Sequence, residues 1–242
     1  MSDVIKLGLL GADGRMGQAV DRLAAERDRV KVVARISAAA PDYAALGACD
    51  AVIDFSSPAA LHAALPHLPD GCALVSGTTG LDAGADAEVA TAARRLAVLR
   101  SGNFSMGINL LLRLAGQAAA SLGDGWDVEV LEMHHRHKVD APSGTALMLG
   151  EAVANGRGVA LDDVAAHDRT GARRPGDIGF AVLRGGGVYG DHEVRLVSDS
   201  EIITLGHSAL NRDVFAQGAL SATDWLVGQG PGLYGMNDVL GL

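Results

Sequence analysis

The residues best suited to chemistry lie in one short stretch, residues 134–147, with the sequence HHRHKVDAPSGTAL. It holds three of the chain's eight histidines and Lys138, which is one of only three lysines. Histidine gives or takes a proton near neutral pH, and lysine transfers one more readily than the permanently charged arginine. These residue types indicate proton transfer, metal binding or the binding of a small anion.

Regular alternation would sort these side chains into two groups. In an extended chain successive side chains point to opposite sides, so His134, Arg136 and Lys138 would share one face as a cluster of hydrogen-bond donors. His135 and His137 would share the other face, where they could fill two corners of a zinc site. The neighbouring sequence supplies no third ligand at motif spacing, so we expect no metal. A solvated basic loop is the remaining alternative.

A predicted helix start follows the histidines. Asp140-Ala-Pro indicates a turn, and Ser143 is a favourable N-cap ahead of Gly144 and Thr145. The first backbone N–H groups of a helix have no partner within it and bind anions. A cationic face and an anion-binding helix start, separated by one turn, suit a small substrate with carboxylates at opposite ends.

A glycine-rich loop near the N-terminus indicates dinucleotide binding. Gly11, Gly14 and Gly17 form G-x-x-G-x-x-G between a predicted strand at Val4–Leu10 and a predicted helix at Arg15–Arg27. Glycines here let the backbone turn tightly and approach a pyrophosphate at the helix start, and they let the helix pack close to the strand. The spacing differs from the common G-x-G-x-x-G, and an ordinary strand-to-helix turn is the alternative.

The end of the second predicted strand bears on the choice of cofactor. NAD-binding domains usually place an acid about 20 residues beyond the loop, where it binds the ribose. The strand Val30–Ser37 ends without one, and no acid occurs before Asp42. Ser37 would hydrogen-bond either cofactor, while Arg35 would either reach a 2′-phosphate or remain a surface cation. We expect NADPH to be accepted at least as well as NADH.

Two further loops follow predicted strands of the same sheet. Gly77–Gly80, with the sequence GTTG, follows the fourth strand, and Ser101–Gly107, with the sequence SGNFSMG, follows the fifth. Ligands of parallel sheets bind outside the carboxyl ends of the strands. Both loops are therefore expected near the nicotinamide half of the cofactor, unless they are plain turns.

The predicted elements divide the chain into two regions. Strand and helix alternate through about residue 105, which predicts an α/β fold with a parallel, doubly wound sheet of Rossmann type. Runs of strands then predominate, which indicates a second, α+β domain, and Asn155–Gly176 is predicted to be a long loop. The expected strands are Val4–Leu10, Val30–Ser37, Ala51–Phe55, Cys72–Ser76, Leu96–Ser101, Trp126–His135, Ile178–Arg184, Glu193–Ser198 and Glu201–Leu205. The expected helices are Arg15–Arg27, a segment after Pro58, Asp82–Arg95, Ile108–Leu122, a segment from Ser143 and Val214–Val227.

Composition restricts the class of protein. The 242 residues are 48% hydrophobic and carry a net charge of −9, which argues for a folded protein and against a general nucleic-acid binder. Cys49 and Cys72 fit no CxxC pattern, in agreement with a reducing cytosol. The N-terminus lacks the features of a signal peptide, and no apolar run approaches the ~18 residues of a membrane span. We expect a cytoplasmic protein that binds neither nucleic acid nor a membrane.

Six motifs together resemble one enzyme family. They occur in order over nearly the whole chain, and the string HHRHK-x-DAPSGTA is highly specific. They are GADGRMG, DFSSP, SGTTG, NFSMGINLL, E-x-HHRHKVDAPSGTAL and RRPGDIGFAVLRGGGVYGDHEV. The chain resembles the 4-hydroxy-tetrahydrodipicolinate reductases, also called dihydrodipicolinate reductases. The resemblance implies reduction of 4-hydroxy-tetrahydrodipicolinate to tetrahydrodipicolinate with NADH or NADPH, in the diaminopimelate and lysine pathway.

The resemblance also implies how the chain is divided. A dinucleotide-binding domain would span residues 1–105 and be completed by residues 213–242. A substrate-binding and tetramerisation domain with an open mixed sheet would span residues 106–212, in a homotetramer. The chain departs from the family in two places, because Ser37 replaces a frequent acidic ribose ligand and the segment 38–50 is short. We therefore leave the cofactor preference open and expect a trimmed helix and strand in that segment.

The roles of single residues follow from the same resemblance. His134 would act as the acid/base and Lys138 as the proton donor, while His135 would help the helix start to hold the substrate carboxylates. Together with the alternation described above, the residues expected to bind substrate are His135, Arg136, Ser143, Gly144 and Thr145. The residues expected to line the cofactor are Gly11, Ala12, Asp13, Gly14, Arg15, Met16, Ser37, Gly77, Thr78, Thr79, Ser101, Gly102, Asn103 and Phe104.

Three other functions are compatible with parts of the pattern. A non-catalytic NAD(P)-responsive regulator would share the glycine loop but would not need His134 and Lys138 as an acid/base set. A zinc hydrolase would use His135 and His137. Another nicotinamide enzyme, such as an amino-acid dehydrogenase, is the nearest alternative.

Overall fold

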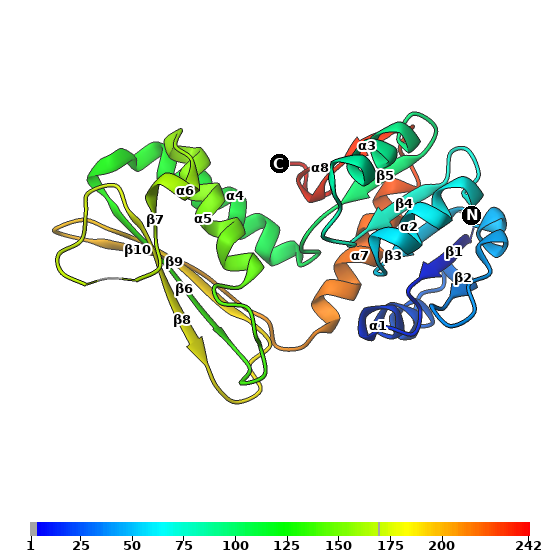
Figure 1. Cartoon of the computed structure of the whole chain (residues 1–242), viewed down its shortest axis with the longest axis horizontal. Helices are drawn as coiled ribbons and strands as arrows, with labels where there is room; N and C mark the ends of the chain where they lie inside the picture. Colours follow the sequence, from blue (N-terminus) through cyan, green and yellow to red (C-terminus); the bar gives the residue numbers. More distant parts are fainter. Residues whose placement is uncertain (1–3, 169) are drawn as a thin grey trace. The chain divides into compact units, whose positions relative to one another are not determined.

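The structure, a computed structural model, describes residues 4–168 and 170–242 (Figure 1). The chain forms two compact units. Unit 1 combines the residues up to Met106 with Asp213–Leu242, and unit 2 consists of Gly107–Arg212. Each unit has its own sheet and its own hydrophobic core, so each is described by itself.

Unit 1 is built on a sheet of six strands that all run parallel, in the order β11-β5-β4-β3-β1-β2. The inner strands are short runs of buried apolar residues, as expected where both faces of a parallel sheet are covered. The parallel, doubly wound sheet predicted from the sequence is confirmed. The strands are β1 (Ile5–Leu10), β2 (Val30–Ile36), β3 (Ala51–Asp54), β4 (Ala73–Ser76), β5 (Ala97–Arg100) and β11 (Gly232–Tyr234).

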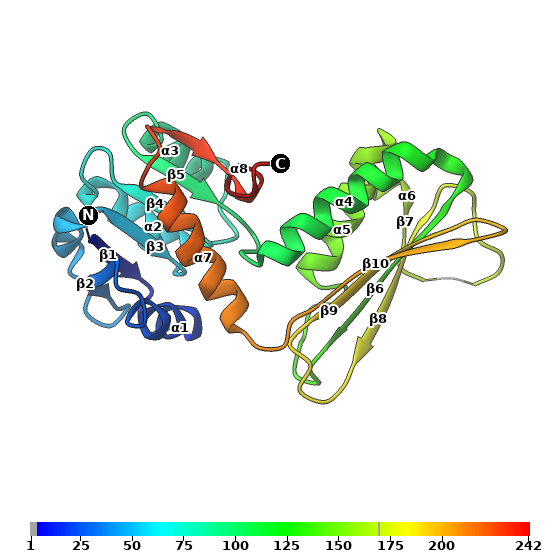
Figure 2. The ribbon, with the colours of Figure 1, turned by 180° about the vertical axis from the view of Figure 1, so that it is seen from behind.

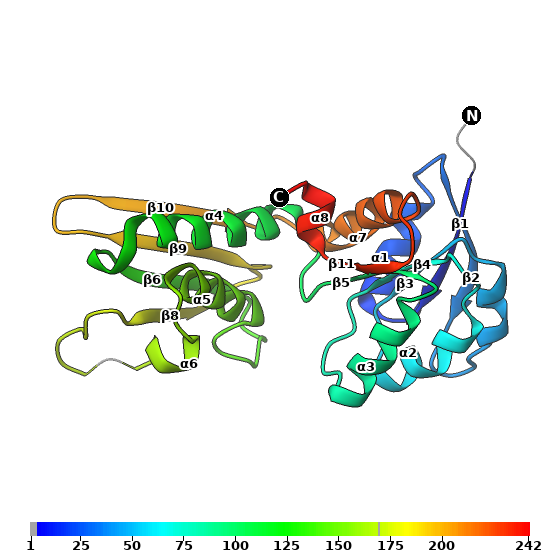
Figure 3. The ribbon, with the colours of Figure 1, turned by 90° about the horizontal axis from the view of Figure 1, so that it is seen from above.

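Helices cover both faces of this sheet, and Figure 3 shows α1, α7 and α8 on one side and α2 and α3 on the other. The neighbouring residues Leu9 and Leu10 illustrate the division. Leu9 packs with Val20 of α1 and Leu220 of α7, whereas Leu10 packs with Leu61 of α2. The helices are α1 (Arg15–Ala24), α2 (Pro58–Ala64), α3 (Ala83–Ala92), α7 (Asp213–Leu226) and α8 (Met236–Leu240).

Two parts of unit 1 differ from a regular strand–helix alternation. Between β2 and β3 the chain forms only a 3-10 helix at Tyr43–Ala48, which is the trimmed segment that we expected. At the other end of the chain, β11 and α8 were not predicted, because three strand residues between glycines carry little periodic signal. Strand β11 becomes a strand by pairing with β5, a contact between residues far apart in the sequence.

Unit 2 contains a mixed sheet of five strands in the order β10-β9-β6-β8-β7. Its helices α4 (Met106–Leu122) and α5 (Gly144–Arg157) cover one face (Figures 1 and 2). Val128 and Val130 of the central strand β6 pack against these helices. Leu131, which alternates with them, lies on the opposite face of the sheet. The strands are β6 (Asp127–His134), β7 (Ala165–Ala166), β8 (Ile178–Arg184), β9 (Asp191–Val197) and β10 (Ile202–Ser208).

The prediction of one long loop over Asn155–Gly176 was wrong. Helix α5 continues to Arg157, and a short helix α6 (Leu161–Val164) and strand β7 follow it. Gly156 lies within the helix at a close approach to α4, where an added Cβ would lie 2.3 Å from the backbone oxygen of Gly116. A glycine that allows two helices to touch has the same sequence signal as a glycine in a loop.

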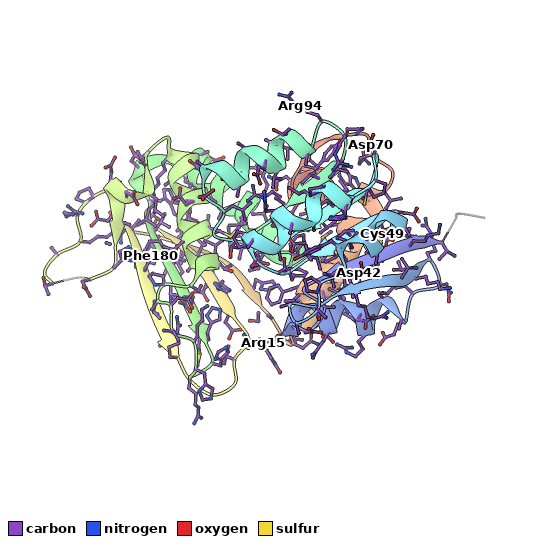
Figure 4. The ribbon with its side chains drawn as sticks, turned by 45° about the vertical axis from the view of Figure 1, so that its right-hand side comes forward. Arg15, Asp42, Cys49, Asp70, Arg94 and Phe180 are labelled. Atoms are coloured by element: carbon purple, nitrogen blue, oxygen red, sulfur yellow. The ribbon has the colours of Figure 1, made fainter. Side chains whose placement is uncertain are left out.

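Side chains from this region complete the core of unit 2. Leu161 of α6 is buried beside Gly150 of α5, and Phe180 of β8, labelled in Figure 4, packs against the same glycine. The ring of His167 stacks on Phe180 with the ring centroids 5.0 Å apart. In the described part of the chain, no helix has both the length and the apolar character that crossing a membrane requires.

Candidate functional site

The glycine loop of unit 1 has the geometry of a dinucleotide-binding turn. Gly11 has a φ of +84°, and a Cβ at this position would lie 2.5 Å from the backbone oxygen of Phe55. A Cβ at Gly17 would lie 2.3 Å from the oxygen of Gly11. Gly14 is the N-cap of α1 and donates its N–H to Gly11 over 3.1 Å. Because these positions carry no side chain, the turn would allow an anion to come close to the backbone N–H groups at the start of α1.

The other candidate cofactor residues of unit 1 gather at the same edge. Ser37 follows β2, Gly77–Thr79 follow β4 and Ser101–Phe104 follow β5, and the carboxyl ends of parallel strands meet at one edge. The loops also touch one another, since the N–H of Ser101 bonds to the oxygen of Ser76 over 3.2 Å. Phe104 is buried, with its ring 5.5 Å from that of Phe55, so its side chain belongs to the core beneath this edge rather than to an exposed cofactor surface.

A buried carboxylate that sequence reasoning missed connects two of these loops. Asp54, the last residue of β3, accepts hydrogen bonds from the hydroxyl of Ser56 (2.5 Å) and from that of Ser76 (2.7 Å). The N–H of Ser56 bonds both to Asp54 (3.0 Å) and to the hydroxyl of Thr78 (3.2 Å). Complete burial raises the pKa of Asp54, although these hydrogen bonds oppose the shift. In the sequence, the feature that could have indicated this role is an acid, Asp54, directly after the apolar run 51–53 of a predicted strand.

Of the two roles considered for Arg35, a ligand for a 2′-phosphate or a surface cation, the structure favours the surface cation. Its guanidinium makes two hydrogen bonds to Asp21 of α1, of 2.9 and 2.7 Å, so the charge is already paired. The hydroxyl of Ser37 accepts a hydrogen bond from the N–H of Ala40 over 3.4 Å and shapes the turn after β2. Arg15, labelled in Figure 4, is the first residue of α1 and is exposed at this edge.

In unit 2, the alternation predicted through Lys138 holds only as far as His134. Strand β6 ends at His134, and the next residues form a turn in which Lys138 donates its N–H to the oxygen of His135 over 3.1 Å. Arg136 is exposed on this turn and therefore does not share a strand face with His134. The donor face predicted from strand geometry is thus wrong, because the chain reverses direction after the strand.

Glu132 is the partner that alternation does place beside His134. The two residues share the buried face of β6, and Nδ1 of His134 lies 2.7 Å from a carboxylate oxygen of Glu132. Arg184 of β8 donates to both oxygens over 2.6 and 2.8 Å, and the N–H of Ser143 donates over 2.9 Å. Burial alone raises the pKa of Glu132, but these bonds outweigh it and leave the pKa below its ordinary value. Glu132 is therefore ionised at neutral pH.

A second buried histidine adjoins this pair. The ring of His192 on β9 stands edge-on to that of His134, with the centroids 5.0 Å apart. Its Nε2 lies 3.2 Å from the hydroxyl of Ser143. Burial, with the nearby His134 adding to the effect, lowers the pKa of His192 to about 4, so this imidazole is neutral under physiological conditions.

The predicted helix start is confirmed. Ser143 is the N-cap of α5, and its hydroxyl accepts a hydrogen bond from the N–H of Ala146 over 3.2 Å. Gly144 is exposed and Thr145 half-buried at the first turn. The ammonium of Lys138 pairs with Asp140 at 2.9 Å, in the turn that leads into this helix. Unit 2 thus brings Lys138, His134 and the start of α5 into one region.

The remaining histidines of the motif belong to the turn. Nε2 of His135 lies 3.5 Å from the guanidinium of Arg212, and its ring centroid is 6.2 Å from that of His137. Partial burial, followed by the charge of Arg212, lowers the pKa of His135. Over residues 4–168 and 170–242, no group of three or more His, Cys, Asp or Glu side chains is arranged to hold a metal ion.

A glycine loop at the edge of a parallel sheet in one unit and a buried Glu132–His134 pair in the other are features of the nicotinamide-dependent oxidoreductases. Residues 5–104 match the N-terminal profile of dihydrodipicolinate reductase, and residues 107–240 match the C-terminal profile. The chain therefore belongs to the dihydrodipicolinate reductase family.

Individual relatives agree with this assignment. The 4-hydroxy-tetrahydrodipicolinate reductase of Parvibaculum lavamentivorans is 46% identical over 270 aligned residues, which cover all of both chains. That of Caulobacter vibrioides is 46% identical over 254 residues, covering all of this chain and 99% of the relative. A dipicolinate-bound dihydrodipicolinate reductase from Paenisporosarcina sp. TG-14 has the same fold, with a TM-score of 0.78 at 20% identity over 96% of this chain and 97% of that one.

Proposed function

We propose that this chain catalyses the NAD(P)H-dependent reduction of 4-hydroxy-tetrahydrodipicolinate to tetrahydrodipicolinate, in diaminopimelate and lysine biosynthesis. The observation that carries this function is the buried pair of Glu132 and His134 beside the helix start at Ser143. It supplies a proton-transferring group next to backbone donors for a carboxylate. The choice of substrate is supported by the two relatives that align over their full length, both of which are 4-hydroxy-tetrahydrodipicolinate reductases.

Unit 1 is proposed as the dinucleotide-binding domain. The bare backbone of Gly11–Met16 would hold the pyrophosphate at the start of α1, where side chains on Gly11 or Gly17 would collide with the fold. Gly77–Thr79 and Ser101–Phe104 would face the nicotinamide from the same sheet edge. When bound, the cofactor supplies the hydride for the reduction.

Unit 2 is proposed as the substrate-binding domain. The N–H groups of Gly144 and Thr145 would bind one carboxylate, and His135 with Arg136 would assist on the turn. Lys138 would anchor the substrate and donate a proton, and its ammonium pairs with Asp140 in the turn that leads into α5. Loss of water from ring carbons C3 and C4 of the substrate would first give a conjugated imine. After hydride has added at C4, His134 or a water that it orients would protonate C3 of the resulting enamine.

The choice of cofactor is a further proposal. The turn after Ser37 presents no carboxylate to repel a 2′-phosphate before Asp42, which lies exposed and is labelled in Figure 4. Arg15 is exposed at the same sheet edge and is a more available cation than the paired Arg35. We therefore propose that NADPH is used at least as well as NADH, to be tested by comparing kcat/KM for the two cofactors.

We also propose that the chain forms a homotetramer through the second sheet. The face of this sheet opposite α4 and α5 carries Leu131, Met133 and Leu183, which line a hollow of about 390 Å³, and Ile202 lies exposed near its edge. Apolar side chains gathered on one face favour association with a second copy. Light scattering is expected to give about four times the chain mass of 24.7 kDa, and Leu183→Glu is expected to reduce it.

The cellular location is proposed as cytoplasmic. The two free, buried cysteines and the nicotinamide-dependent chemistry suit a reducing compartment. Burial raises the pKa of Cys49 to about 11 and that of Cys72 to about 12, so both thiols stay protonated and unreactive. Fractionation of cells that express the chain tests this location.

The central experiment follows the absorbance of NAD(P)H with the cyclic imine as substrate. The wild-type chain is expected to oxidise NAD(P)H only when the imine is present. Lys138→Ala is expected to lower kcat by about 10²-fold or more while the cofactor binds as before, because a proton donor is lost in unit 2 and the sheet edge of unit 1 is untouched. Near-wild-type turnover of this variant would contradict the role of Lys138.

A further inference from the structure

We infer that Glu132 is a positioning residue that fixes two parts of the substrate site at once, the imidazole of His134 and the start of α5. This inference rests on the proposed function. Glu132 is not among the residues expected to touch substrate or cofactor, and only 2% of its surface is exposed. It acts through the groups that it holds.

The first contact determines which nitrogen of His134 carries a proton. An ionised carboxylate only accepts hydrogen bonds, so the 2.7 Å contact requires a proton on Nδ1. The remaining nitrogen, Nε2, is then the one that exchanges a proton with substrate or water. It lies beside Gly190, where an added Cβ would come within 3.0 Å of it. Glu132 therefore selects the tautomer and the ring orientation together.

The second contact fixes the helix start. The same carboxylate accepts the N–H of Ser143, the N-cap of α5, over 2.9 Å. The hydroxyl of Ser143 in turn lies between the N–H of Ala146 and Nε2 of His192. A shift of Glu132 would therefore move the imidazole and the carboxylate-binding N–H groups relative to each other. Errors of about 1 Å in such geometry lower rates by about 10²-fold.

Arg184 anchors the carboxylate from the neighbouring strand. Its two bonds to Glu132 form a fork, and it also donates to the backbone oxygen of Asp140 in the turn that carries Lys138. One ion pair thus connects strand β6, strand β8 and the turn before α5. Lys138 and His134 then occupy defined places relative to the same carboxylate.

The groups around His134 determine how its proton would respond to pH. Among the described residues, Glu132 on the same strand is the anion that hydrogen-bonds the ring, and Arg184 on β8 pairs with Glu132. His192 on β9 faces the ring and is neutral, and Lys138 with Asp140 stands on the following turn. Removing the negative charge of Glu132 would therefore leave a protonated His134 without a compensating anion.

The alternative is that Glu132 and Arg184 merely hold the sheet together, and the variant Glu132→Gln separates the two roles. The amide cannot accept from His134, Arg184 and Ser143 together, because one of its two terminal atoms is a donor. If Glu132 positions His134, kcat should fall about 10²-fold, the basic limb of the kcat profile should move to lower pH, and the Kd for NADPH should stay unchanged. A structural clamp alone would lower the amount of folded protein without moving the pH profile.

Asp177→Asn is the matched control. Asp177 is also a buried carboxylate of unit 2 that pairs with an arginine, Arg174, at 3.0 Å, but it has no contact with His134. This variant should keep the wild-type kcat and pH profile. If Glu132→Gln does not fold, Glu132→Asp retains the charge on a shorter side chain and should show the same losses to a smaller degree.

Two measurements complete the test. In a His134→Gln background, Glu132→Gln should lower kcat less than threefold further, since a positioning residue has no effect without the residue it positions, and a full 10²-fold additional loss would overturn the inference. Nitrogen-15 spectra of labelled histidines should show a proton on Nδ1 of His134 in the wild type and its loss in Glu132→Gln. These spectra need no turnover, so they decide the role of Glu132 even if the wild type fails to reduce the imine, a failure that would contradict only the proposed function.

Discussion

The two units each bury one carboxylate at their candidate sites, and the two carboxylates have opposite properties. Asp54 in unit 1 accepts from hydroxyl groups and a backbone N–H, and burial keeps its pKa raised. Glu132 in unit 2 is also shielded from solvent, yet Arg184 and His134 lower its pKa. Burial alone does not determine the charge of a carboxylate, because the charge of its partners decides it.

The difference agrees with what we propose that each site holds. The edge of unit 1 is formed by backbone, with glycines that would leave room for a dinucleotide and a carboxylate that orders loops without adding a charged partner. The site of unit 2 is formed by charged and titratable side chains, which suits the transfer of a proton. We therefore expect unit 1 to be sensitive to added atoms and unit 2 to be sensitive to lost charge.

The largest effect is expected from an added atom in unit 1. Gly11→Ala places a Cβ 2.5 Å from the backbone of Phe55, in a backbone conformation with φ of +84°. This should cost about 3 kcal/mol of unfolding free energy and weaken NADPH binding at least tenfold. Chemical denaturation and cofactor titration measure the two effects. Gly71→Ala is the control, because Gly71 has a φ of +79° and no atom within 4 Å, and it precedes β4 rather than following it; this variant should show only the smaller backbone cost.

Loss of charge in unit 2 should come next. Glu132→Gln removes an ionised acceptor from Arg184 and should cost about 2 kcal/mol at neutral pH. The folded pKa of Glu132 lies below its ordinary value of 4.5, so its stabilising contribution is full above pH 4.5 and is lost as the pH falls through the folded pKa. Unfolding free energies of wild type and variant should therefore converge on acidification. A gap that did not narrow would mean that the charge of Glu132 does not stabilise the fold.

A smaller effect is expected where an added atom meets the imidazole of unit 2. Gly190→Ala would bring a Cβ within 3.0 Å of Nε2 of His134, close enough to displace the ring by a few tenths of an ångström. We expect kcat to fall about tenfold with little change in the Kd for NADPH. Steady-state kinetics and a cofactor titration measure both. Equal losses in the two quantities would show that the substitution disturbs more than His134.

The smallest effect is expected for Asp54→Asn. Its folded pKa is raised above the ordinary value of 3.8, so its stabilising contribution is full below pH 3.8 and declines as the pH rises through the folded pKa. Near neutral pH, the asparagine variant should therefore unfold within about 1 kcal/mol of the wild type, and its KM for NADPH should change less than threefold. A large loss of stability at neutral pH would mean that Asp54 is held as an anion, like Glu132.

Much of the site could be predicted from the sequence, because its motifs are local. The glycine loop, the N-cap at Ser143 and the strand ending near His134 depend on residues within a few positions of one another, and all three occur as predicted. The parallel direction of the strands in unit 1 follows from the strand–helix alternation. Glu132 itself lay within reach of sequence reasoning, since residues two apart on a strand share a face.

What the sequence could not determine depends on long-range contacts. Arg184 and His192 come from strands about 50 residues away, and they meet Glu132 and Ser143 only because β8 and β9 flank β6. Strand β11 is defined by its pairing with β5, and the space that excludes a side chain at Gly156 is set by Gly116 on another helix. The sequence by itself therefore determined the chemical groups and the local elements, since propensity and spacing act over a few residues. The tertiary structure decided which charges meet and which of them stay ionised, because burial and pairing arise only when distant strands pack together.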